Sequence, residues 1–302
     1  TSDSIWFKDT HIWMPGSKAA GDGRYAFDNN DFDLVLRGQP ISFADIRFIM
    51  PQMPARGEGT LDFLLRWRGD TSTYIARKAD IHVDSATAGG DFAISMVGDS
   101  LWFHDTDIRF SSVDTHLIEQ MVPGFDIPRH GTLSGNAKLD GPPGLMNVDG
   151  DVAFDDARYG RSRVVAKGAV GTTGRGVRFR DLDVTLDPVQ VGMARTFVAT
   201  LPIAGAVRGS ARLNGETDRQ LAVRTDLTHT DAGVRSRVAG NATLRLGKTP
   251  WMDVDARLLP LSLTEVGKFV PAAGLQGAAV GPVRATGDLR NLAIDARLAL
   301  AA

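Results

Sequence analysis

The chain has 302 residues, of which 43% are hydrophobic and 23% are charged, a composition typical of a folded protein and not of a disordered tail. Its net charge of −2, with arginines scattered among aspartates, provides no field for phosphate backbones, so we expect no nucleic-acid partner. Cysteine is absent, which excludes disulfides and a thiolate nucleophile, and no apolar run is long enough for a transmembrane segment within this chain.

The first predicted element is a strand, "IWFKDTHIWM" from Ile5, whose apolar residues change parity halfway along. The same change recurs in "LWFHDTDIRF" from Leu101 and in "VRFRDLDVTL" from Val177. An extra residue in each strand would return all the apolar side chains to one face. The pattern therefore predicts β-bulges near Lys8-Asp9, His104-Asp105 and Arg180-Asp181.

A short helix and a run of strands come next. "FADIRFIMPQMP" from Phe43 has helical spacing and ends at prolines, and "GTLDFLLRWRG" from Gly59 begins a series of alternating segments. The following segments, "YIARKADIHVDSAT", "GGDFAISMVGD" and "SLWFHDTDIRFSS", complete four sequential strands of an antiparallel meander. A second helix is predicted in "VDTHLIEQMVPG".

This order recurs along the chain. "GTLSGNAKLDG" at Gly131, "GAVRGSARLNG" at Gly205 and "GAAVGPVRATG" at Gly277 match the strand at Gly59, at spacings of 72, 74 and 72 residues. Helical candidates "ARTFVATLP" from Ala194 and "LTEVGKFVP" from Leu263 precede the last two. We predict a mostly β fold of repeated meander units, with a period of about 73 residues and one short helix each. The predicted units are 1–58 (partial), 59–130, 131–204, 205–276 and 277–302 (partial).

Three of the four Gly-framed strands have glycine at the same inward position, namely Gly135, Gly209 and Gly281. A glycine inside a strand often marks the close approach of another element. The preceding helix is the nearest candidate, so we expect Gly209 to lie beneath residues 197–201. A turn is expected at Gly174.

Motifs that suggest chemistry have simpler explanations. The esterase-like "GDSL" at 98–101 lies between two alternating strands and has no matching base, which favours a hairpin turn over a catalytic Ser100. The six histidines form no linear zinc motif, so no metal site is predicted from them. "DNNDFD" at 28–33 is a loop that would suit calcium. Trp6 and Trp102 recur at equivalent places, which favours core packing.

The short helix ending in proline, followed by the Gly-framed strand and further strands, resembles the AsmA-like and TamB-like envelope proteins of Gram-negative bacteria. The resemblance implies a periplasmic, membrane-associated protein without catalytic residues or cofactor, built as an elongated, curled, β-taco-like sheet. Its apolar concave face would bind or conduct lipid acyl chains. The positions implied as lipid-binding are Leu61, Phe63, Leu65, Trp67, Leu133, Leu139, Val207, Leu213 and Val283.

A second hypothesis is a structural scaffold subunit docked on the periplasmic side of an inner-membrane protein complex. In that case each helix would fill the interior of its own unit. An enzyme is not expected, because no catalytic constellation is present.

Overall fold

The structure is a computed structural model that describes residues 3–48, 51–98, 100–121, 127–174, 176–194, 202–246, 250–268, 274–288 and 291–301. The chain is mostly β, as the sequence predicts, and its described residues form an antiparallel meander with four short helices. It divides into two compact units, Thr1–Val152 and Ala153–Ala302, which are described separately. None of the helices in the described residues has the length and apolarity that crossing a membrane requires.

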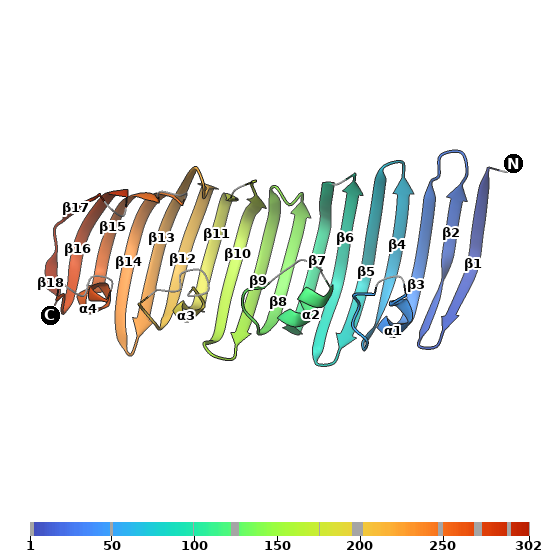
Figure 1. Ribbon diagram of the computed structural model, residues 1–302, viewed down its shortest axis with the longest axis horizontal. Helices are drawn as coiled ribbons and strands as arrows, with labels where there is room; N and C mark the ends of the chain where they lie inside the picture. Colours follow the sequence, from blue (N-terminus) through green and yellow to red (C-terminus); the bar gives the residue numbers. More distant parts are fainter. Residues whose placement is uncertain are drawn as a thin grey trace. The chain divides into compact units, whose positions relative to one another are not determined.

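The first unit contains β1 (Ser4–Met14), β2 (Ser17–Ala26), β3 (Phe32–Ser42), α1 (Phe43–Ile46), β4 (Glu58–Arg68), β5 (Thr71–Val83), β6 (Ala86–Val97), β7 (Ser100–Asp114), α2 (Thr115–Met121), β8 (Thr132–Gly141) and most of β9 (Met146–Asp156). From β1 to β8, each strand pairs antiparallel with the next. Figure 1 shows these eight strands side by side in chain order.

The second unit contains β10 (Gly160–Thr172), β11 (Val177–Gln190), α3 (Val191–Ala194), β12 (Ala206–Glu216), β13 (Gln220–Asp231), β14 (Val234–Arg245), β15 (Trp251–Ser262), α4 (Leu263–Gly267), β16 (Ala278–Asp288), β17 (Leu292–Ala296) and β18 (Ala299–Ala301). Strands β10 to β17 again pair antiparallel in order, and β18 continues on β16 beside β17. Among the described residues, every helix follows a strand and precedes a new run of strands.

The bulges predicted from the parity changes are confirmed. The register shifts between Phe7 and Thr10 in β1, and it shifts around the corresponding positions of β7 and β11. Asp9, Asp105 and Asp181 adopt left-handed φ values of 49°, 38° and 48°. The extra residue therefore returns the second half of each strand to the apolar face.

A second kind of bulge, which the sequence analysis missed, lies just before each helix. The register shifts between Gly38 and Ile41, between Phe110 and Val113, between Leu186 and Val189, and between Leu258 and Leu261. In three of these shifts a proline is skipped, at positions 40, 188 and 260. Proline has no N–H for the ladder, which makes it a usable signal for a bulge.

Each helix is tied to the strand that follows it by one backbone hydrogen bond. The N–H of the first helical residue donates to a glycine carbonyl: Phe43 to Gly57 at 2.9 Å, Thr115 to Gly131 at 3.0 Å, Val191 to Gly205 at 2.9 Å and Leu263 to Gly277 at 2.8 Å.

The partner of the first helix is Gly57 and not Gly59. The sequence alignment of the first Gly-framed strand is therefore wrong by two residues. Gly38 faces Leu61 on β4, just as Leu186 faces Gly209 on β12, so Leu61 is the structural counterpart of Gly209.

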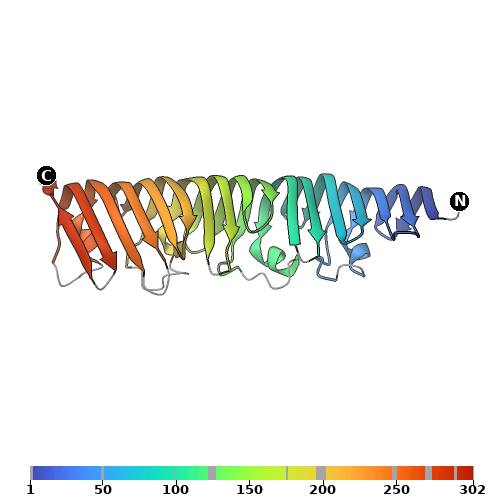
Figure 2. The same ribbon diagram turned by 90° about the horizontal axis from the view of Figure 1, so that it is seen from above.

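The first unit has its core where the helices meet one end of the sheet. Phe43 of α1 and Met53 pack with Val83 and Ala86 at the ends of β5 and β6, and Leu117 of α2 joins this cluster. Figure 2 shows α1 and α2 on the same side of the sheet. The helices thus cover one end of the strands.

Candidate functional site

The candidate site is the apolar face of the sheet, which we define by residues paired across neighbouring strands. In the first unit, one cross-strand row, called row A, consists of Phe7, Gly23, Leu34, Leu65, Tyr74, Ile94, Phe103 and Gly141. Row A crosses eight strands without a charged side chain. The path is uninterrupted because the bulges keep the apolar side chains of every strand on the same face.

The two ends of this face differ in exposure. Near α1 and α2, Val83 and Ala86 are buried. At the other end of the strands, Phe7 is 44% exposed, Trp67 43% and Met96 41%. Large apolar side chains on the open end therefore lack a cover, and a contiguous exposed apolar surface usually marks a binding site.

The second unit has a comparable face. A cross-strand row, called row B, consists of Leu182, Leu213, Val223, Ala242, Val254, Ala285 and Ile294 on β11 to β17. Beside α4, a cavity of about 240 Å³ opens on the same face, lined chiefly by Ile203, Val207, Leu227, Val238, Leu261 and Val266. Its lining is mostly alkyl, with His229, Ser236 and Glu265 as polar members.

The opposite face carries ion pairs between neighbouring strands. Arg37 lies 3.0 Å from Asp62, Lys138 lies 3.0 Å from Asp107, and Arg284 lies 3.0 Å from Asp255. These side chains are partly exposed, so each pair contributes little stability. The ladder of charges instead identifies this face as the one that is solvated, which leaves the other face for an apolar partner.

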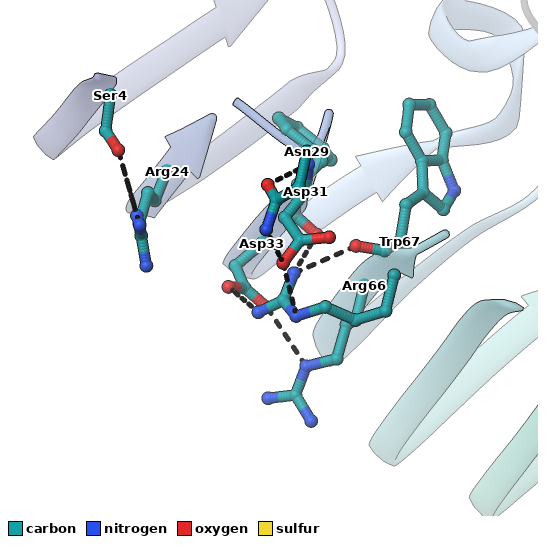
Figure 3. A network of polar contacts seen from close by, with 9 residues as sticks. Ser4, Arg24, Asn29, Asp31, Asp33, Arg66 and Trp67 are labelled. Carbon is teal, nitrogen blue, oxygen red and sulfur yellow. Dashed lines mark hydrogen bonds and ion pairs between the residues drawn. The ribbon is translucent and has the colours of Figure 1, made fainter. Parts of the chain in front are cut away.

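The loop at 28–33, whose acids would suit calcium but for which no metal was predicted, belongs to this ion-pair system. Figure 3 shows Arg66 reaching Asp33, with 3.0 Å between Nε and Oδ1. Arg68 forms ion pairs with Asp33 and with Asp31. Burial raises the pKa of Asp33, but hydrogen bonds from Arg68 and Arg66 outweigh burial and hold the pKa below its usual value. Because arginines already neutralise these carboxylates, the calcium hypothesis is not supported.

The described residues show which backbone atoms approach the inward glycines. A Cβ on Gly209 would lie 2.1 Å from the carbonyl oxygen of Asp226 on β13, and equivalent atoms on Gly135 and Gly281 would meet the carbonyls of Asp151 and Arg297. Among the described residues, this close approach is made by the backbone of the next strand or, for Gly281, of the segment between β17 and β18. The expected contact with residues 197–201 lies outside the described residues.

The nine positions predicted to bind lipid share one face within each unit. Leu61, Phe63, Leu65 and Trp67 alternate along β4, and the register carries the same face to Leu133 and Leu139 on β8. In the second unit, Leu213 is in row B, Val207 lines the cavity, and Val283 lies in a neighbouring row. The sequence pattern placed these residues correctly on one face within each unit; lipid binding itself stays a prediction.

Two features of the molecule were not predicted from its sequence. Trp6 and Trp102 were expected in the core but are 61% and 47% exposed, because they alternate with Phe7 and Phe103 of row A and so lie on the charged face. The second feature is a group formed by His116, Glu119 and His130, whose potential ligand atoms lie within 4.8 Å of one another. Its only local signal is the His-x-x-Glu spacing in α2, since His130 comes from outside the helix.

Fold and site define a mostly β protein with one charged face and one partly uncovered apolar face. Comparison of the chain with family models, curated proteins and solved structures gives no significant match.

Proposed function

We propose that this is a non-enzymatic, periplasmic and membrane-associated envelope protein that binds or conducts lipid acyl chains along its apolar face. The supporting observation is row A, an uncharged path across β1 to β8 with exposed apolar residues beside it. The proposal includes an AsmA-like or TamB-like repeat organisation with a period of about 73 residues and a curled, elongated sheet.

The chemistry of the face suits an alkyl chain. The backbone N–H and C=O groups along row A pair within the sheet, so the surface offers few polar groups to an occupant. Covering such a surface gains about 25 cal/mol for each Å² of apolar area removed from water. A ligand without hydrogen-bonding groups therefore gives up no hydrogen bonds with water when it binds there.

The dimensions of row A also fit. Seven steps between strands, each about 4.8 Å, give a path of about 34 Å. This length is comparable to the hydrocarbon core of a bilayer, about 30 Å, which holds two layers of acyl chains. One extended acyl chain therefore fits within the row.

The test uses a matched pair of substitutions on β4. Leu65→Glu places a carboxylate in row A, whereas Leu64→Glu places the same group on the charged face, where Leu64 pairs with Val35 and Ile75. Burying an unpaired carboxylate against an acyl chain costs several kcal/mol. We expect native mass spectrometry of protein extracted from membranes to show bound lipid in wild type and Leu64→Glu but not in Leu65→Glu. Equal lipid retention by both variants would contradict the proposal.

The second candidate function is a scaffold subunit docked on the periplasmic side of an inner-membrane complex. Exposed tryptophans on the charged face favour it: Trp13 is 70% exposed and stacks on His11, with ring centroids 5.3 Å apart. Aromatic and arginine side chains are enriched where proteins bind each other. The described neighbours of Gly135, Gly209 and Gly281 are backbone atoms of the following segment, so these glycines favour neither candidate.

A photo-crosslinker at position 63 separates the two candidates. Phe63 lies on the apolar face beside row A, paired with Leu36 and Ala76. Capture of lipid supports the acyl-chain function. Capture of only the chain's own residues, in a protein that always copurifies with a membrane complex, supports the scaffold.

A further inference from the structure

The most distinctive polar cluster of the described residues combines two imidazoles and a carboxylate. His116 and Glu119 lie one helical turn apart on α2, and His130 lies just before β8. The two rings stack with their centroids 3.9 Å apart and an interplanar angle of 11°. One potential ligand atom from each of the three residues lies within 4.8 Å of the others.

Outer contacts already orient two of these groups. His116 Nδ1 lies 2.8 Å from Asp114 Oδ1, and the His116 backbone N–H donates to the same oxygen. That contact leaves Nε2 as the nitrogen available to an ion. Glu119 Oε1 accepts a 2.8 Å hydrogen bond from the Ile127 N–H, while its Oε2 lies 3.8 Å from His130 Nδ1. Carboxylate and backbone partners of this kind typically orient metal ligands.

We propose that His116, Glu119 and His130 bind one divalent transition-metal ion of the zinc class, with water completing the coordination. Two imidazoles and one carboxylate are a common protein ligand set for zinc. Ligand atoms around tetrahedral zinc are roughly 3.3 Å apart, so the cluster must contract by rotation of its side chains. The two histidine side chains are about half exposed or more, which leaves them room to rotate.

The ion would act as a cross-link. It joins α2 to the segment before β8, in addition to the hydrogen bonds between Thr115 and Gly131. Because Leu117 of α2 packs on the core cluster, the cross-link would hold the helix over the covered end of the apolar face. This inference is independent of the proposed lipid function.

The test is isothermal titration of the untagged, metal-free 302-residue chain with zinc chloride near pH 7.5. We expect one zinc ion per chain, and binding at least tenfold weaker in His116→Ala, His130→Ala and Glu119→Gln. The matched control is His82→Ala. His82 is also exposed and ion-paired, 3.1 Å from Asp80. Among the described residues, however, His82 belongs to no group of three potential metal ligands. Unchanged circular dichroism of each metal-free variant establishes that it folds.

Two further measurements sharpen the result. Cobalt(II) should give the absorption bands of a low-coordinate site in wild type but not in His130→Ala. Calcium and magnesium should not compete, because both prefer oxygen ligands. Absence of zinc binding by wild type, or an equal loss of affinity in His82→Ala, would overturn the proposal.

Discussion

Strand pairs β4–β5 and β12–β13 occupy equivalent places after α1 and α3, yet they accommodate the same distortion differently. In β4–β5 the register shifts at Leu61, and Lys78 on β5 takes a left-handed φ of 50°. In β12–β13 the register is unbroken, and Gly209 takes a φ of 135°. The pair β4–β5 therefore accommodates the distortion with an extra residue, and the pair β12–β13 with a glycine.

The preceding strands differ in the complementary way. Gly38 on β3 faces Leu61, whereas Leu186 on β11 faces Gly209. Each pair contains one leucine and one glycine, in opposite positions. The structure therefore constrains the cross-strand pair of one leucine and one glycine, and not the residue at a single position of the repeat.

The largest effect is expected for Gly209→Leu. A φ of 135° is unfavourable for any side chain, and the new Cβ would lie 2.1 Å from the carbonyl oxygen of Asp226. Backbone strain and overpacking together should lower the free energy of unfolding by about 3 kcal/mol. Urea unfolding of the purified chain measures the loss.

Gly174→Leu is the control for this prediction. Gly174 was expected in a turn; its φ lies outside the left-handed range, and a Cβ there would meet nothing within 4 Å. Its unfolding free energy should change little. Equal losses in the two variants would contradict the close-approach explanation.

A smaller effect is expected for Asp91→Ala on β6, which removes contacts with the bulge of β5. Asp91 Oδ1 accepts a 2.8 Å hydrogen bond from the backbone N–H of Lys78, and its other oxygen lies 3.1 Å from Arg77. Loss of these contacts at a partly exposed site should cost about 1 kcal/mol. The equivalent pair β12–β13 has an unbroken register with a glycine in place of the bulge. Its stability should therefore not depend on a carboxylate that binds a bulged backbone N–H.

The same substitution has a defined pH signature. The Lys78 N–H lowers the pKa of Asp91, burial opposes it, and Arg77 lowers it further, so the folded pKa lies below the usual 3.8. Its contribution to stability is therefore complete above pH 3.8 and is lost as pH falls through the folded pKa. The difference between wild type and Asp91→Ala should shrink in acid; a difference that grows there would contradict this assignment.

The smallest effect is expected for Arg237→Ala on β14, which contacts Asp226 on β13, the second strand of the unbulged pair. Arg237 binds Asp226 through two hydrogen bonds of 2.8 and 2.7 Å, but both side chains are nearly half exposed. Solvent and salt screen such a pair, so the melting temperature at physiological salt should not change measurably. A large decrease would show that the charged face contributes more to stability than its exposure indicates.

The alternation of apolar residues along the sequence accounts for many of the strands and bulges of this protein. Alternation of apolar residues predicted the strands, and the parity changes predicted the bulges at Asp9, Asp105 and Asp181, because a side chain's face depends only on counting along its own strand. Within each unit, the proposed lipid-binding positions fall on one face for the same reason.

How the strands match one another depends on contacts between strands, which the pattern within one strand does not contain. A slip of two residues leaves every side chain on its face, so sequence spacing could not distinguish Gly57 from Gly59 as the partner of α1. A glycine carries no side chain that reveals which neighbour approaches it, so the sequence did not identify β13 as the neighbour of Gly209. His130 joins His116 and Glu119 because the chain folds back from α2 to β8, a contact that no linear motif encodes.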